Sequence, residues 1–180
     1  MAARLPALLA TLLPLSNAQC LVGIMGGAIS VEGSPATAQP IFQPYGITVD
    51  SSGYFVSDSS GGGNRVVRVF FNGSMVTALG IFRNTGGWSG DGGRGTMAFI
   101  NNPASVSADG GGGFLVCDKG NHLVRRLHPN GTVVRVAGNL TAGWSGDRGA
   151  ATSATLNSPS GVSYDNSVVD GGAWIADTNK

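Results

Sequence analysis

The chain has 180 residues, of which 42% are hydrophobic and 12% are charged, and its formal net charge is +1. The hydrophobic fraction is enough for a core, which argues against disorder. The near-neutral charge argues against a nucleic-acid partner, because such a partner requires a basic surface. Glycine accounts for 30 residues without an every-third-residue spacing, which excludes collagen. Glycines scattered in pairs and runs instead predict many turns, and therefore many short strands.

The N-terminus has the pattern of a secretory signal peptide at residues 1–18. Arg4 gives a positive start, Leu5–Leu15 is an apolar run, and Ser16 and Ala18 are small residues of the kind that a signal peptidase reads. The run is shorter than the roughly 20 residues that span a bilayer, so no membrane span is predicted. We expect cleavage after Ala18 and a secreted mature protein. The alternative is a buried N-terminal segment.

Cys20 and Cys117 are the only cysteines, so the chain is not a disulfide scaffold. A bridge between the two is one interpretation. The other, favoured by the repeat described next, is that Cys117 is a small core residue.

Three stretches of the chain carry the same landmarks in the same order. The first is PYGITVDSSGYFVSDSSGGGNRVVRVFFNGSMVTALG from Pro44, the second is PASVSADGGGGFLVCDKGNHLVRRLHPNGTVVRVAG from Pro103, and the third is PSGVSYDNSVVDGGAWIADTNK from Pro159. The prolines are 59 and 56 residues apart. The other matched landmarks are Asp50, Asp109 and Asp165, then Asp58, Asp118 and Asp177, then the Asn-Gly dipeptides at Asn72 and Asn130.

Each stretch predicts short antiparallel strands rather than helices, because no window shows a sustained helical period. The Asn-Gly dipeptide is the strongest short hairpin signal, since both central residues must tolerate a positive φ. A four-stranded meander cannot bury both of its faces alone, whereas copies arranged around an axis can. The predicted fold class is therefore all-β, a β-propeller built of four-stranded antiparallel blades, incomplete at about two and a half blades.

The expected organisation follows from the repeat. It comprises a signal peptide at 1–18, a lead-in and first linker at 19–43, blade 1 at 44–80, a linker and blade 2 at 81–138, and a linker and truncated blade 3 at 139–180. An open strand edge and bare apolar blade faces drive association. We therefore expect a truncated product or a fragment that oligomerises or aggregates.

The segment CDKGNHLVRRLHPNGTVVRVAG, followed by GWSGDRGAATSATLNSPSGVSYD, closely resembles the NHL-repeat β-propellers. The resemblance covers about Gly26 to Lys180 and is strongest in the second unit, whereas the first unit lacks the Trp-Ser-Gly-Asp and Asn-His motifs. It implies a propeller that presents loops to a partner and acts as a binding scaffold. The alternative is a lyase or hydrolase with an axial metal site, as in some similar propellers. Intracellular NHL propellers bind RNA, but the signal peptide and the near-neutral charge argue against that here.

The motif GWSGD occurs twice, at Gly87–Asp91 and at Gly143–Asp147, in the linkers between units. In a meander these linkers share a face with the loop DKGNH. The binding-face candidates are therefore Trp88, Asp91, Asn121, His122, Trp144 and Asp147. We interpret the tryptophans as wedges that pack the linker between blades; the alternative is an aromatic platform for a sugar or a peptide.

The aspartates of this motif are expected to accept hydrogen bonds from the next backbone amides, as in Asx-turns. Calcium binding is the alternative, although no Asp-x-Asp-x-Asp spacing occurs. Apart from this calcium alternative, no cofactor is predicted.

Asp58, Asp118 and Asp177 end the second strand of each unit and are predicted to cap amides of their own loops. Three equivalent copies do not supply the different roles that an active site needs, so no catalytic residue is predicted. His122 and His128 lack the further ligands of a zinc site. The arginines Arg125 and Arg126 are expected to pack their stems and keep their heads in water. The expected partner is a protein or a carbohydrate.

Three sequons occur, NGS at Asn72, NGT at Asn130 and NLT at Asn139. The first two lie in predicted hairpin turns on the face opposite the linkers, and Asn139 enters a linker where access is hindered. In a eukaryotic host we expect a glycan on Asn72 or Asn130. The alternative is that Asn-Gly serves the turn alone.

Overall fold

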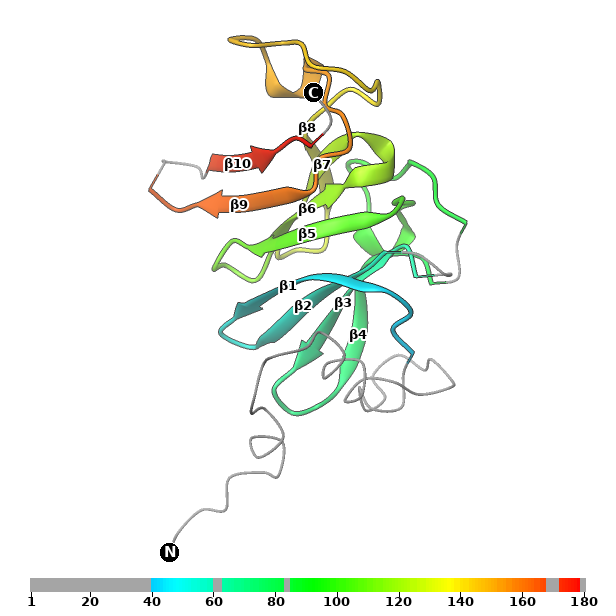
Figure 1. Cartoon of the computed structure of the whole chain (residues 1–180). Helices are drawn as coiled ribbons and strands as arrows, with labels where there is room; N and C mark the ends of the chain where they lie inside the picture. The colour runs from blue at the N-terminus through cyan, green and yellow to red at the C-terminus, as the bar shows by residue number, and fades with distance from the viewer. Residues whose placement is uncertain (1–39, 60–62, 83–84, 168–171, 179–180) are drawn as a thin grey trace, which may run out of the picture.

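The computed structural model describes residues 40–59, 63–82, 85–167 and 172–178. These residues form three antiparallel sheets that follow one another along the chain (Figure 1). The expected signal peptide and Cys20 lie outside the described residues. Within the described residues, no helix is long and apolar enough to cross a membrane.

The first sheet is a four-stranded meander, the second sheet repeats it, and the third contains two strands. The strands are β1 (Pro44–Asp50), β2 (Gly53–Asp58), β3 (Arg65–Phe70), β4 (Met75–Gly80), β5 (Pro103–Ala108), β6 (Phe114–Asp118), β7 (Leu123–Leu127), β8 (Val133–Ala137), β9 (Gly161–Asp165) and β10 (Gly172–Ala176). Short 3-10 helices lie in the connections: η3 (Gly95–Met97), η4 (Lys119–Asn121) and η5 (Ala151–Ser153). The prediction of an incomplete β-propeller of four-stranded antiparallel blades is confirmed. We call the sheets blades 1, 2 and 3 in chain order.

The Asn-Gly dipeptides close the hairpins between the third and fourth strands of blades 1 and 2. Gly73 and Gly131 have φ values of 86° and 84°, a region that residues with a Cβ avoid. Oδ1 of Asn72 accepts a hydrogen bond from the amide two residues later at 2.9 Å, and Oδ1 of Asn130 does the same. A local hydrogen bond and a glycine together specify each turn.

An aspartate and an arginine hold the turn after the first strand of each complete blade. Oδ1 of Asp50 accepts two turn amides, and Oδ2 pairs with Arg68 at 2.8 Å. Asp109 of blade 2 repeats both contacts, with Arg126 at 2.9 Å. Burial raises the pKa of both carboxyls, but the amide and arginine donors outweigh it and hold each pKa below its usual value. These repeated aspartates are therefore turn residues.

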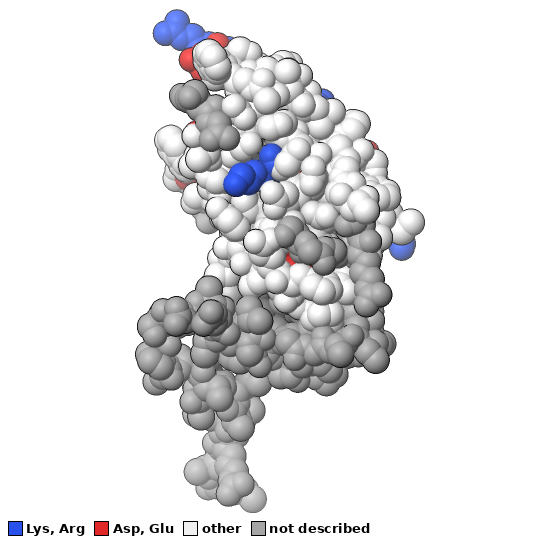
Figure 2. Space-filling view, turned by 45° about the vertical axis from the view of Figure 1, so that its right-hand side comes forward, with Lys and Arg blue, Asp and Glu red and all other residues white. Residues whose placement is uncertain are grey.

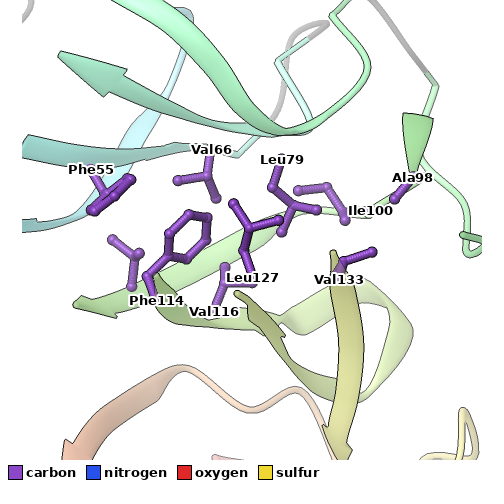
Figure 3. Close-up of a cluster of buried hydrophobic side chains, with 10 residues drawn as sticks. Phe55, Val66, Leu79, Ala98, Ile100, Phe114, Val116, Leu127 and Val133 are labelled. Carbon is purple, nitrogen blue, oxygen red and sulfur yellow. The ribbon is translucent and has the colours of Figure 1, made fainter. Parts of the chain in front are cut away.

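The main core lies between blades 1 and 2, where each presents an apolar face to the other (Figure 3). Phe55 of β2 and Phe114 of β6 are its largest members, with ring centroids 4.7 Å apart. Burial of each ring stabilises the fold by about 1.5–3 kcal/mol. The other members come from both blades and the linker between them: Val66, Leu79, Ala98, Ile100, Val106, Val116, Leu127 and Val133. A further cluster joins blades 2 and 3 and includes Cys117.

The linker between blades 1 and 2 does insert into the core, but not through its tryptophan. Ala98 and Ile100 are fully buried in the cluster, whereas Trp88 is 43% exposed. Trp144 in the next linker is 72% exposed. The wedge interpretation of the tryptophans is therefore wrong. The segment after the motif is the part that passes between the blades, so closely that a Cβ on Gly95 would lie 2.4 Å from a leucine methyl of β7.

Replacement of Ile100 by alanine is expected to lower the free energy of unfolding by about 2–5 kcal/mol, because it leaves a cavity between two blades. Trp88→Ala, at an exposed position of the same linker, is expected to change it by only about 0.5 kcal/mol. Urea denaturation followed by far-ultraviolet circular dichroism measures both. Equal losses in the two variants would restore the tryptophan as a packing element.

Candidate functional site

The loop between the second and third strands of blade 2 meets the linker that enters this blade. Nδ2 of Asn121 donates to the carbonyl oxygen of Gly87 at 2.7 Å and to both carboxylate oxygens of Asp118 at 2.9 Å. Gly87 opens the first GWSGD motif. The start of this motif and the DKGNH loop therefore lie together, as the meander topology predicts.

A buried arginine ties the same motif to the blade. The Arg125 side chain is 0% exposed, and its Nε and Nη2 lie 3.0 and 2.6 Å from Oδ1 of Asp91. It also donates to the carbonyl oxygens of Ser89 and Phe99, each at 2.9 Å. Its Nη1 lies 3.7 Å from Oδ2 of Asp118. One guanidinium group thus holds two separate parts of the linker against the end of β6.

These contacts correct two expectations. Asp91 was expected to accept the amides that follow it, but its carboxylate accepts from the side chain of Arg125 instead. Arg125 was expected to keep its head in water, but the head is buried. The physical reason is that the linker covers this face of β7, so the guanidinium has no route to water and its donors must be satisfied inside the protein.

Blade 1 has an equivalent arginine at a different strand position. Arg65 is 0% exposed, donates to the carbonyl oxygen of Pro40 at 2.7 Å, and places Nε 3.5 Å from Oδ2 of Asp58. Arg65 lies opposite Asp58 in the ladder, whereas Arg125 lies opposite a residue two positions before the corresponding aspartate. Side chains two residues apart on a strand share a face. Both guanidinium groups therefore reach the same place relative to the blade.

The aspartate that ends the second strand accepts linker amides in every blade. Oδ1 of Asp58 accepts two, at 3.0 and 2.9 Å, and Oδ1 of Asp118 and of Asp177 each accept one at 2.8 Å. The donors are the amides of Phe42, Gln43, Asn101 and Asn157. The three aspartates therefore cap the incoming linker, because the linker passes the end of the second strand on its way to the first.

Burial dominates the ionisation of two of these carboxyls. It raises the pKa of Asp118 to about 7, although hydrogen bonds from Asn121 and Asn101 and the charge of Arg125 lower it. The neighbouring carboxylate of Asp91 adds to the rise. Burial also raises the pKa of Asp58. Asp118 therefore titrates close to neutral pH.

His122 and Asp147 belong to the connection toward blade 3. His122 has a left-handed backbone with φ of 57°, and its Nδ1 accepts a hydrogen bond from the amide of Ser158 at 3.1 Å. Asp147 is exposed, and no arginine pairs with it in the part of the chain that the structure describes. Of the six binding-face candidates, Asn121, His122 and Asp91 are thus engaged in structural contacts. Trp88, Trp144 and Asp147 face solvent.

Aromatic side chains stay exposed on a supported backbone. Trp88 and Trp144 occupy the same place in the motif, and Phe99, a residue that sequence reasoning missed, is 40% exposed beside the first copy. In the second copy, the amide of Ser145 donates to Oγ1 of Thr155 at 2.7 Å, and the amide of Thr155 donates back to the Ser145 carbonyl at 3.0 Å. The rings therefore project from loops that are held by hydrogen bonds.

The site does not have the composition of a metal or thiol centre. Within the described ranges, no group of three or more His, Cys, Asp or Glu side chains could hold a metal ion. Cys117 is a free, buried thiol whose pKa burial raises to about 12. Such a thiol is a core residue without nucleophilic character at neutral pH.

Charge is sparse on the surface as well. Figure 2 shows a face on which Lys and Arg side chains are isolated and separated by uncharged atoms. This face therefore lacks the clustered cations that a nucleic-acid interface uses.

The buried arginines make the structural contacts at this site that sequence reasoning missed. A signal for them exists in the strand alternation, because Arg125 falls on the same strand face as Leu123 and Leu127, both buried. A charged residue in an apolar series, with an aspartate at the end of the preceding strand, indicates an internal ion pair.

Comparison with known proteins identifies the fold alone. No family model matches the chain, and no curated protein matches it. A solved structural genomics protein of unknown function from Bacteroides thetaiotaomicron is 24% identical, with a TM-score of 0.64 over 86% of this chain and 36% of that one. Auxiliary nutrient binding proteins from Bacteroides thetaiotaomicron and Bacteroides ovatus are 19% and 21% identical, with TM-scores of 0.50 and 0.51, over 70% of this chain and 32% of theirs. The chain thus spans about a third of the length of these proteins.

Replacement of Arg125 by methionine is expected to lower the free energy of unfolding by about 3–5 kcal/mol, because Asp91 and two linker carbonyls lose their donor and the buried Asp118 loses its counter-charge. Arg94→Met is the control, since Arg94 is an exposed arginine of the same linker, and is expected to change stability by about 0.5 kcal/mol. Urea denaturation at neutral pH compares the two. A loss below about 1 kcal/mol for the Arg125 variant would contradict the stabilising role.

Asp118 is expected to make stability depend on pH. Its pKa is about 7 in the folded protein against the ordinary value of 3.8, so the folded state binds the extra proton between these values. The contribution is fully present below about pH 4 and is lost as the pH rises through about 7, by at most about 1.4 kcal/mol per pH unit. The measurement is the difference in free energy of unfolding between wild type and Asp118→Asn at about pH 4, 6 and 8. A difference that grows with pH would show that Arg125 outweighs burial.

Proposed function

We propose that the chain acts as a secreted β-propeller scaffold of the NHL-repeat type, which binds a carbohydrate or a protein ligand through exposed aromatic side chains of its linkers. The observation that carries the proposal is the exposure of Trp88 and Trp144, at 43% and 72%, at the same place in two copies of one motif. Tryptophan offers a large ring face for stacking and a ring N–H donor, and it is enriched at binding hot spots.

The support beneath the rings favours binding. Arg125 donates to the carbonyl oxygen of Ser89, the residue after Trp88, and it pairs with the carboxylate of Asp91 two residues further on. A side chain on a held backbone loses less conformational freedom when a ligand covers it, which favours affinity. The similar structures from Bacteroides include proteins named for nutrient binding, which is in keeping with a propeller that presents a ligand site.

The proposed NHL-type assignment is supported by the contacts that residues of the NHL-like stretch make in the structure. Asp118, Asn121 and Arg125, all within the stretch that resembles the family, form one connected set of contacts with the linker. The secretion proposal rests on the N-terminal sequence pattern. If the protein is secreted from a eukaryotic cell, Asn72 and Asn130 are the glycan acceptors that we propose, because both are exposed in turns. Asn139 suits a glycan less well, since its Nδ2 donates to a linker carbonyl at 3.2 Å.

Replacement of both Trp88 and Trp144 by alanine is expected to weaken ligand binding at least about tenfold, since each ring that stacks on a ligand contributes of the order of 1 kcal/mol. The probes are a panel of neutral oligosaccharides and a panel of extended peptides, each titrated by calorimetry. Phe71→Ala is the matched control, because Phe71 is 50% exposed after β3, away from the linkers. Equal affinity of the wild type and the double variant for the bound probe would contradict the proposed site.

A further inference from the structure

The two Asn-Gly hairpins share one hydrogen-bond pattern but carry different side chains two residues before the asparagine. In blade 1 the amide of Phe70 donates to the carbonyl oxygen of Ser74 at 2.9 Å, and the amide of Gly73 donates to the carbonyl oxygen of Phe70 at 2.8 Å. The hairpin of blade 2 repeats both contacts, each at 2.9 Å, with His128 in the place of Phe70. One turn thus presents a phenyl ring where the other presents an imidazole.

The phenyl ring and the sequon asparagine lie on the same face of the blade 1 hairpin. The hydroxyl of Ser74 donates to Oδ1 of Asn72 at 2.8 Å, so the Asn72 side chain lies beside that of Ser74. Ser74 is directly opposite Phe70 across the hairpin. Directly opposite side chains of an antiparallel pair share a face, with Cβ atoms about 4.5–5.5 Å apart. A group attached to Nδ2 of Asn72 therefore lies within reach of the ring.

The Phe70 ring is supported on one side and partly open to water. It is half-buried at the end of β3, and the guanidinium carbon of Arg68 lies 5.0 Å from its centroid. Arg68 is itself held by Asp50 at 2.8 Å. Arg68 precedes the ring in the chain and Asn72 follows it in the turn. A ring that is held from the strand side is suited to receive a group that comes from the turn.

We propose that the Phe70 ring is the docking surface for the first N-acetylglucosamine of a glycan on Asn72. The C–H bonds on one face of a sugar ring carry a slight positive charge, which the negative face of an aromatic ring attracts, and the contact also buries apolar surface. The inference rests on the proposed function, because it requires secretion from a eukaryotic cell. The docked sugar stabilises the blade 1 hairpin. A glycan on Asn130 gains little, since His128 offers a smaller ring with a polar tip.

A thermodynamic cycle between the sugar and the ring tests the docking. The full chain, led by a foreign secretion signal, is produced in a eukaryotic host with the other two sequons disabled by Thr132→Ala and Thr141→Ala. An endoglycosidase then trims the glycan to its first sugar, and the sugar-free chain comes from a bacterial host. By urea denaturation, the sugar is expected to raise the folding equilibrium constant about three- to tenfold, and less than about twofold in Phe70→Leu. Phe70→Tyr keeps an aromatic face and is expected to retain the gain.

The hairpin of blade 2 is the matched control. In a chain that keeps only the Asn130 sequon, through Ser74→Ala and Thr141→Ala, the first sugar is expected to raise the folding constant less than about twofold. His128→Phe is expected to bring this gain to the blade 1 value.

Nuclear magnetic resonance supplies a measurement that does not depend on stability. The ring current of Phe70 is expected to shift the sugar-ring protons on Asn72 upfield relative to Phe70→Leu, with nuclear Overhauser contacts between the sugar and the phenyl ring. An equal gain in the wild type and Phe70→Leu, or in the two wild-type hairpins, overturns the docking, as does the absence of the upfield shift. A bare Asn72 in the secreted chain also overturns it. Because a foreign signal supplies secretion, failure of the chain's own N-terminus to direct export contradicts the proposed function and not the docking.

Discussion

The pairing of a buried guanidinium with the aspartate that ends the second strand determines the path of the linker at each complete blade. Arg125 reaches Asp118 on the blade and Asp91 on the linker at the same time. A buried charge without such partners costs several kcal/mol, so the linker cannot leave this path without losing them. The depth at which Ile100 enters the core and the outward position of the GWSGD motif both follow from that path.

The same constraint connects the fold to its proposed function. A linker that is held from beneath by Arg125 leaves only its outward side chains free to meet a partner. Trp88 and Phe99 are such side chains. The guanidinium binds the carbonyl oxygen of Phe99 itself and that of Ser89, the residue after Trp88. The contacts that stabilise the blade therefore also restrict the motion of the aromatic surface, and this lowers the entropic cost of binding.

The strands and turns could be predicted from the sequence because their determinants are local. Asn72 and Asn130 each bond an amide two residues away and are followed by a glycine with positive φ. The linker contacts could not be predicted in the same way, because Arg125 and Asp91 are 34 residues apart and meet only after the linker has folded back. For the same reason the motif GWSGD does not by itself show whether its tryptophan is packed between blades or exposed. The burial of Ala98 and Ile100 decides between them.

The two complete blades place the buried guanidinium group at the same position but supply it from different strand positions. Matched through the ladder, Arg65 falls on Leu123 and not on Arg125, so the two arginines do not align letter by letter. The guanidinium nevertheless occupies one place, because a shift of two residues keeps a side chain on the same face of a strand. A side-chain hydroxyl behaves in the same way, since Thr48 and Ser107 each accept an amide from the first strand of the next blade. The blades of this chain therefore keep the position of a donor or an acceptor, while the residue that supplies it differs.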